Sequence, residues 1–182
     1  CEKLIFEILD SAQQERLASD LQLDFAYEIA ELGRFRGSAM MHQAGLSVSF
    51  RIIPPVIPSL EQLGLPETVR KIMDNHQGLI LVTGATGQGK STTLAAIIDE
   101  ANKTRKDHII TVEDPIEYLF KDQKAIVSQR EIGIDTKDFD EALTYLMRQD
   151  PDVVFVGEMR DARTVSAGMR ATETGHLVFG TM

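Results

Sequence analysis

Hydrophobic and polar positions follow one pattern before a proline-rich segment and another after it. Before it, apolar residues at helical spacing open the chain. The stretch from Leu21 to Ile29 then alternates apolar with polar side chains, as a half-buried strand does. Two further strand-like stretches follow, separated by a short turn that contains a glycine. This pattern predicts a small α+β domain. Its expected elements are helices over 4–9 and 12–19 and strands over 21–29, 34–41 and 46–53.

The proline-rich segment and the part that follows it are organised differently. Three of the six prolines fall within residues 54–58, where they exclude a regular helix or a central strand and favour an extended linker. Beyond it, short apolar runs alternate with helical patterns, which is typical of a parallel sheet covered by helices on both faces. The expected strands are 79–83, 108–112, 125–129, 153–156 and 177–181, and the expected helices are 59–63, 67–74, 90–102, 138–148 and 161–172. The predicted parts are a domain over 1–53, a linker over 54–65 and an α/β domain over 66–182.

A phosphate-binding motif lies between the first strand and the long helix of the α/β domain. The segment GATGQGKS, residues 84–91, matches G-x-x-x-x-G-K-[ST] in the strand–loop–helix context that the motif requires. Glycines let backbone N–H groups wrap around phosphate oxygens, and the helix N-terminus adds partial positive charge. Lys90 is expected to reach the β- and γ-phosphates of ATP, and the Ser91 hydroxyl is expected to bind Mg²⁺. The residues expected to bind the nucleotide are Gly84, Ala85, Thr86, Gly87, Gln88, Gly89, Lys90, Ser91 and Thr92.

Two groups of carboxylates are candidates for the remaining chemistry of such a site. A P-loop ATPase needs an acidic group near the metal and a group that orients or deprotonates the attacking water. Glu158 comes two residues after one expected strand, and Glu113, Asp114 and Glu117 follow another. Carboxyl ends of parallel strands meet at the edge of the sheet where ligands bind. The spacing does not choose among Glu113, Asp114 and Glu117.

Charge and composition disfavour several classes of function for this protein. The 182 residues include 19 Lys and Arg against 28 Asp and Glu, a formal net charge of −9, which disfavours non-specific binding to nucleic acid. The apolar runs are far too short to span a bilayer, and the one cysteine, Cys1, cannot form an internal disulfide. The chain starts on Cys and stops at the end of an expected strand, so we expect it to be cut from a longer protein.

Four motifs together resemble those of the type II/type IV secretion ATPases. Besides the phosphate loop, TVEDPIEY at 111–118 resembles the acidic "Asp box" of the family. VGEMRD at 156–161 resembles its Glu-bearing Walker B motif, and ETGHLVFGT at 173–181 resembles the beginning of its "His box". The four motifs occur in the order that the family has. Within the family, the segments SQREIG, GEMRD and FGT are most similar to those of the ATPases that retract type IV pili.

The resemblance implies a fold and a set of site residues. The fold would be a RecA-like P-loop domain with a parallel sheet, incomplete at its C-terminus, preceded by a small α+β, PAS-like N-terminal domain. Glu117 would be the catalytic base on water, and Glu158 would support Mg²⁺. His176, otherwise an ordinary histidine at a strand start, would sense the γ-phosphate or lie at a ring interface. The implied catalytic residues are Glu117, Glu158, Lys90 and His176, and the implied metal ligands are Ser91 and Glu158.

Two strands of the first domain resemble the arginine-bearing strands of the family. In the family, the arginines of these strands face the nucleotide of a neighbour in a hexameric ring. The corresponding arginines of this chain are Arg34, Arg36 and Arg51. A guanidinium in that place acts as an arginine finger that neutralises charge developing on the γ-phosphate. Arg34 and Arg36 alternate along one strand and therefore share a face. The alternative is that these arginines pair with acidic residues nearby in an acidic chain.

The implied function is that of a homo-hexameric ATPase motor for type IV pilus retraction, or twitching motility. The motor would act from the cytoplasm at the inner face of the bacterial inner membrane, on a platform protein, peripheral to the membrane and without binding nucleic acid. The piece alone is expected to be weakly active or inactive. The alternatives are a pilus assembly or type II secretion ATPase, a RecA-like nucleic-acid motor, which the charge disfavours, and a non-catalytic nucleotide-binding regulator, which the intact site residues disfavour.

Overall fold

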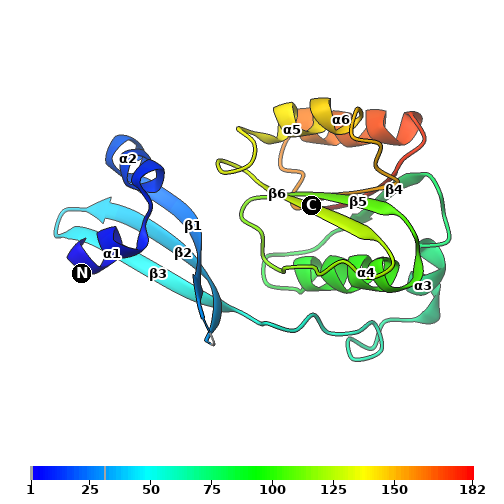
Figure 1. Ribbon diagram of the computed structural model, residues 1–182, viewed down its shortest axis with the longest axis horizontal. Helices are drawn as coiled ribbons and strands as arrows, with labels where there is room; N and C mark the ends of the chain where they lie inside the picture. Colours follow the sequence, from blue (N-terminus) through cyan, green and yellow to red (C-terminus); the bar gives the residue numbers. More distant parts are fainter. Residues whose placement is uncertain (1, 31) are drawn as a thin grey trace. The chain divides into compact units, whose positions relative to one another are not determined.

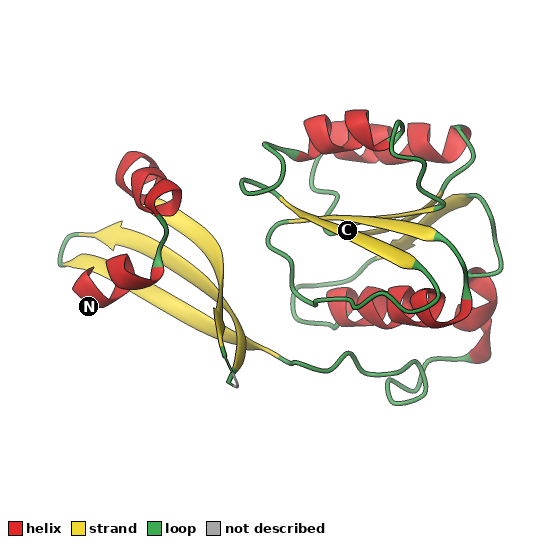
Figure 2. Ribbon diagram, in the orientation of Figure 1, coloured by secondary structure: helices red, strands yellow, loops and turns green. Residues whose placement is uncertain are grey.

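The computed structural model describes residues 2–30 and 32–182, so the cysteine at position 1 lies outside the described residues. The chain forms two compact units, with the boundary between Pro55 and Val56. Figure 1 follows the sequence through each unit, and Figure 2 shows which segments are helices, strands and loops. Among the described residues, no helix combines the length and the apolar character needed to cross a bilayer.

The first unit is an antiparallel sheet with two helices packed on it. Its elements are α1 (Glu2–Ile8), α2 (Ser11–Asp20), β1 (Gln22–Ile29), β2 (Gly33–His42) and β3 (Gly45–Ile53), with the strands in the order β1-β2-β3. Asp10 begins α2 because its Oδ1 accepts from the N–H of Gln13 at 2.8 Å, and the Gln13 side chain accepts from the Asp10 N–H in return.

The core of the first unit is smaller than the alternating pattern predicts. Leu23 and Phe25 are buried, but Leu21 is 58% exposed and Ile29 is 40% exposed. Leu21 instead ends α2 in a left-handed conformation, and β1 begins one residue later. The side chains of α1 and α2 in the core contact the sheet around Leu23 and Phe25, which leaves the ends of β1 uncovered.

The second unit is a five-stranded, fully parallel sheet with helices on both faces, as the strand–helix alternation predicts. The strands lie in the order β4-β8-β7-β5-β6. The elements are α3 (Glu67–Ile72), β4 (Gly78–Val82), α4 (Lys90–Thr104), β5 (His108–Glu113), β6 (Ile126–Glu131), α5 (Phe139–Leu146), β7 (Val153–Val156), α6 (Ala162–Glu173) and β8 (Leu177–Thr181).

Alternate residues of the central strands serve two separate cores. Ile109 packs on the face that α4 covers, whereas its neighbour Ile110 packs on the face that α5 and α6 cover. Figure 1 shows α4 on one side of the sheet and α5 and α6 on the other. Because both faces of the sheet are covered at its centre, the inner strand β7 is apolar throughout, and Val153–Val156 is buried at every position.

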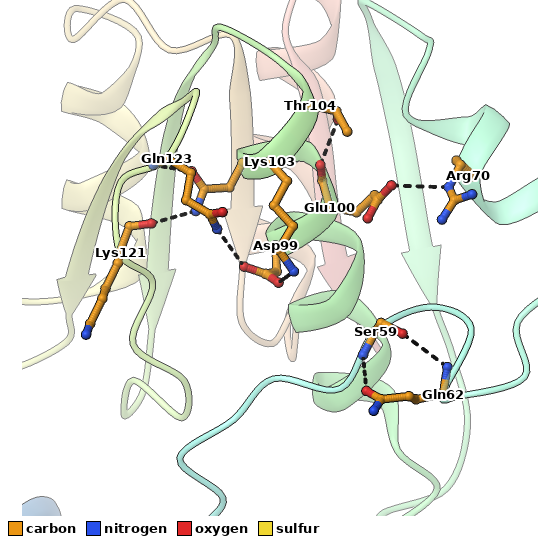
Figure 3. A network of polar contacts seen from close by, with 10 residues as sticks. Ser59, Gln62, Arg70, Asp99, Glu100, Lys103, Thr104, Lys121 and Gln123 are labelled. Atoms are coloured by element: carbon orange, nitrogen blue, oxygen red, sulfur yellow. Dashed lines mark hydrogen bonds and ion pairs between the residues drawn. The ribbon is translucent and has the colours of Figure 1, made fainter.

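The segment expected to be a linker belongs largely to the second unit. Leu60 is only 4% exposed and contributes to the core beneath α4. The helix expected over 59–63 is a turn, in which Ser59 and Gln62 exchange side-chain and backbone hydrogen bonds (Figure 3). Gly64, with a φ of 65°, ends this turn before it can continue as a helix. The turn therefore packs as part of the α/β unit.

Candidate nucleotide-binding site

The phosphate loop, residues 84–89, joins the carboxyl end of β4 to the first residue of α4. Gly87 and Gly89 have φ values of 81° and 83°, a left-handed conformation that glycine adopts without strain. Gly89 precedes α4 and has no side chain that could accept hydrogen bonds from the first N–H groups of this helix. Lys90 curls back across the loop, and its Nζ donates to the Gly84 carbonyl at 2.7 Å. An exposed helix N-terminus beside a lysine ammonium is suited to an anion.

The predicted acidic site residues follow strands that end at the same edge of the sheet as β4. Parallel register aligns Val82 with Thr181, Gly180 with Val156, and Val156 with Val112. The carboxyl ends of β4, β7 and β5 therefore lie at one edge. The structure places the phosphate loop, Glu158 and the acidic segment after β5 along this edge, as the sequence predicts.

Glu113 differs from the other acidic residues of its segment in being buried. It is 5% exposed, and its Oε1 accepts from the Thr111 hydroxyl at 2.7 Å and from the Gln129 amide at 3.3 Å. Burial raises the pKa of the Glu113 carboxyl to about 7, although these hydrogen bonds oppose the shift. Asp114 is exposed and Glu117 is half-buried. The structure thus leaves Asp114 and Glu117, and not Glu113, in a position to meet water.

Glu158 lies just beyond β7 and is partly exposed. Its Oε2 is 2.7 Å from Nη2 of Arg160, and the Glu158 side chain is 45% exposed. The preceding Gly157 contacts β5 closely, since a Cβ there would lie 3.3 Å from the Cα of Glu113. The Thr181 hydroxyl also donates to the Gly157 carbonyl at 2.6 Å. The turn that carries Glu158 is therefore packed against both neighbouring strands.

A contact that the sequence pattern does not predict joins the acidic segment to the phosphate-loop helix. The hydroxyls of Tyr118 and Thr92 are 3.3 Å apart, and Tyr118 is 8% exposed. The two residues are separated by 26 positions, and no local spacing rule connects them. The one available signal was that Tyr118 stands next to Glu117 within the acidic motif.

His176 is not brought together with the phosphate loop of the same chain. It immediately precedes β8, and its carbonyl accepts from the N–H of Gly78 at the beginning of β4. The phosphate loop follows the opposite end of β4. Nδ1 of His176 lies 2.9 Å from the Ala171 carbonyl and 3.1 Å from the Thr174 hydroxyl. In this chain His176 therefore belongs to the turn between α6 and β8.

The three arginines lie on one face of the sheet in the first unit. Arg36 pairs with Arg51 across β2 and β3, and Arg34 lies two residues before Arg36. Nη2 of Arg36 is 3.5 Å from Asp24, and Nη1 of Arg34 is 4.0 Å from Glu28. These two arginines thus show the pairing with nearby acids that the sequence allowed. Arg51 is exposed.

Few protein groups are available to hold a metal ion. In the part of the chain that the structure describes, no cluster of three or more His, Cys, Asp or Glu could hold one. Ser91 and Glu158 are oxygen donors at the same sheet edge. Mg²⁺ usually takes one or two such protein ligands and completes its shell with phosphate oxygens and water. The donor set therefore fits Mg²⁺ delivered with a nucleotide.

A parallel sheet with a phosphate loop after an edge strand and acidic segments after its inner strands defines the P-loop class of α/β proteins. The family model described as Type II/IV secretion system protein matches residues 6–182, and the chain belongs to this family. This match confirms the family that the four motifs predict.

Individual relatives confirm the resemblance to pilus retraction ATPases. The chain is 45% identical over 179 residues to the type IV pilus retractation ATPase PilT of Pseudomonas aeruginosa, covering 98% of this chain and 52% of the relative. It is 43% identical over 179 residues to a twitching motility protein of Neisseria gonorrhoeae, covering 98% and 48%. A crystal structure of the pilus retraction motor PilT with bound ADP matches with a TM-score of 0.94 at 49% identity, covering 100% of this chain and 53% of that one. The chain thus spans about half the length of these relatives.

Proposed function

We propose that this chain is the nucleotide-binding part of an ATPase that powers type IV pilus retraction. The observation that carries the proposal is the common sheet edge, which holds a complete phosphate loop and two acidic segments. The PilT relative is named as a retraction ATPase, and the PilT crystal structure contains ADP. The protein would act as a homo-hexamer on a platform protein at the cytoplasmic face of the inner membrane.

The positions of the residues, together with the family resemblance, support the following roles. The N–H groups of the phosphate loop and the first turn of α4 would bind the phosphates of ATP, and Lys90 would neutralise charge on the β- and γ-phosphates. The Ser91 hydroxyl would bind Mg²⁺ directly, and Glu158 would support the ion through water. The ion would neutralise charge on the phosphates. Glu117 would orient and deprotonate the attacking water. We place His176 at a subunit interface, since it lies away from the phosphate loop of its own chain.

The main alternative is a motor for pilus assembly or type II secretion. It would use the same residues and the same reaction, and it would differ in the direction of movement and in the partner. A nucleic-acid motor is disfavoured by the net charge of −9. If single-stranded DNA stimulated ATP hydrolysis, the nucleic-acid alternative would be preferred.

Two variants of the full-length protein test the proposed chemistry. Lys90→Ala is expected to abolish hydrolysis and to weaken ATP binding, because the phosphates lose their main positive charge. Glu117→Gln is expected to bind ATP normally and to lower kcat by about 100-fold or more, the usual contribution of a general base. The measurements are phosphate release and nucleotide affinity.

Lys103→Ala is the matched control, since Lys103 lies in the last turn of the same helix and pairs with Asp99. It is expected to keep wild-type turnover. Wild-type hydrolysis by Lys90→Ala would refute the assignment of the phosphate loop. Wild-type hydrolysis by Glu117→Gln would refute the assignment of the base.

A further inference from the structure

The segment that carries Glu117 has no regular secondary structure of its own. We call residues 114–120 the acidic loop; it begins directly after β5 and contains neither helix nor strand. A general base must be held within a narrow range of positions, because a displacement of about 1 Å can cost about 100-fold in rate. The contacts that hold the acidic loop therefore bear on the position of Glu117.

Two side chains of β6 hold the backbone on either side of Glu117. The carboxylate of Glu131 accepts from the N–H of Ile116 at 3.0 Å, and Nε2 of Gln129 donates to the carbonyl of Tyr118 at 2.8 Å. Gln129 and Glu131 alternate along one strand and therefore point to the same face of the sheet. Their partners are the two residues that flank Glu117 directly.

Gln129 makes more of these contacts than Glu131 does. Its Oε1 accepts from the N–H of Phe120 at 2.8 Å while its Nε2 donates to the carbonyl of Tyr118. Nε2 also lies 3.3 Å from the carboxylate of Glu113 at the end of β5. Both ends of one amide are thus engaged by the acidic loop, so only one orientation of the amide satisfies all three partners.

The loop held in this way reaches back toward the phosphate loop. Two strands separate β5 from β4, a distance of about 14 Å at the usual spacing between strands. Even so, the Tyr118 hydroxyl lies 3.3 Å from that of Thr92 in the first turn of α4. Gln129 therefore holds the backbone of a residue whose side chain contacts the helix that begins at the phosphate loop.

We propose that Gln129 is a positioning residue for hydrolysis, which acts through the backbone of the acidic loop to place Glu117 beside the phosphates. This inference rests on the proposed function, because it takes Glu117 as the base. Gln129 itself touches neither nucleotide nor water in this role. Its removal changes where Glu117 lies and leaves the phosphate loop intact.

The test is a double-mutant cycle in the full-length protein with Gln129→Leu and Glu117→Gln. Gln129→Leu alone is expected to lower kcat by about 10-fold or more, within the range that misplacement of a catalytic group produces. The affinity for ATP is expected to stay within about 2-fold, since the phosphate loop is unchanged. In the Glu117→Gln background, Gln129→Leu is expected to cause no further fall in single-turnover rate, because the group that it positions is already absent.

Gln123→Leu is the matched control in the same segment of chain. Gln123 is exposed, and its amide donates to the carboxylate of Asp99 in α4 at 3.4 Å (Figure 3). It is expected to keep wild-type kcat. If Gln129→Leu melts near the assay temperature, Gln129→Glu replaces it, since that variant keeps the acceptor for Phe120 and loses the donor to Tyr118 and to Glu113. In the Glu117→Gln background, Gln129→Glu is likewise expected to cause no further fall in the single-turnover rate.

The outcomes separate this inference from the proposed function. If Glu117→Gln kept wild-type turnover, the proposed base would be wrong and the inference would fail with it. If Glu117→Gln were slow but Gln129→Leu lowered the rate further in that background by its full factor, only the inference would be overturned. Unchanged kcat in both Gln129 variants, or a loss of ATP affinity equal to the loss of kcat, would overturn it as well.

Discussion

Three carboxylates within five residues of the acidic segment have different surroundings. Glu113 is 5% exposed, Asp114 is exposed, and Glu117 is half-buried. Because burial penalises the charged form, the pKa of Glu113 is raised to about 7, and part of this carboxyl population keeps its proton at neutral pH. Glu113 therefore acts as a hydrogen-bonded packing residue beneath the acidic loop, and Asp114 and Glu117 remain the candidates for contact with water.

The raised pKa of Glu113 predicts that folding stability falls as the pH rises. The folded protein retains a proton up to about pH 7 that an ordinary glutamate, with a pKa of 4.5, has already lost. The contribution of this proton to the free energy of unfolding is present in full below pH 4.5 and is lost as the pH rises through about 7. The loss amounts to about 3 kcal/mol for this group. In Glu113→Gln this part of the pH dependence should be absent, as urea unfolding at pH 5 and pH 8 would measure.

Glu173→Gln is the control for this experiment, since Glu173 is an exposed glutamate at the end of α6. It should show the same pH dependence as the wild type. An equal loss of stability between pH 5 and pH 8 in Glu113→Gln and in the wild type would contradict the prediction.

Helix α4 is held at both ends by contacts to segments far along the chain. Near its beginning, Thr92 contacts the acidic loop. Near its end, Asn102 is fully buried, and its Nδ2 donates to the Lys121 carbonyl at 2.8 Å while its Oδ1 accepts from the Gln123 N–H at 3.1 Å. This second contact fixes the approach of the chain to β6, the strand that carries Gln129.

Asn102→Ala is expected to lower the free energy of unfolding by about 1–3 kcal/mol. The substitution removes the side chain that bonds the Lys121 carbonyl and the Gln123 N–H. A backbone group that loses its hydrogen bond lowers stability where water does not take the place of the lost partner. Urea denaturation followed by circular dichroism would measure the change. Asn75→Ala is the matched control, because Asn75 is exposed and its side chain contacts only the carbonyl of Ile72 among the hydrogen bonds seen here.

The control variant should differ from the wild type by no more than about 0.5 kcal/mol. Equal effects of the two asparagine substitutions would mean that the buried position of Asn102 contributes nothing beyond the general cost of replacing asparagine in a helix or a turn.

Across the whole chain, the arginines and the phosphate loop belong to different units. Arg34 and Arg36 have acidic partners within the first unit, whereas Arg51 lies exposed beside Arg36 on the same face of the sheet. By the family resemblance, such an arginine would lie against the nucleotide of a neighbouring subunit in a ring. Of the three, Arg51 is the one that we propose for this contact.

Mixing two inactive variants of the full-length protein tests this assignment. Arg51→Ala and Lys90→Ala are each expected to hydrolyse ATP poorly, since each lacks one component of every site in a ring. Mixed rings should regain partial activity, because an intact Lys90 from one variant then meets an intact Arg51 from the other. Arg16→Ala, a substitution on the exposed part of α2, should be active without mixing. Mixtures no more active than the separate variants would contradict action between subunits.

Local patterns in the sequence predicted most of the helices and strands of the second unit. The continuous apolar run over 153–156 became β7 with the same bounds, because a strand covered on both faces needs an apolar side chain at every position. The segment at 59–63 was wrongly expected to be a helix, since Gly64 and Pro66 limit it to a turn. Leu21 and Ile29 were expected on the buried face of a half-buried strand, but two short helices cannot cover the full length of β1.

The phosphate loop, the acidic motifs and the family could be recognised from sequence because each depends on residues that are close together in the chain. Four other features could not be recognised from sequence. They are the burial of Glu113, the contact of Tyr118 with Thr92, the hydrogen bonds of Gln129 to the acidic loop, and the position of His176 at the opposite edge of the sheet. Each of these depends on the strand order β4-β8-β7-β5-β6, which brings together residues many positions apart. Local spacing carries no information about that order, because it follows from how the helices cover the two faces of the sheet.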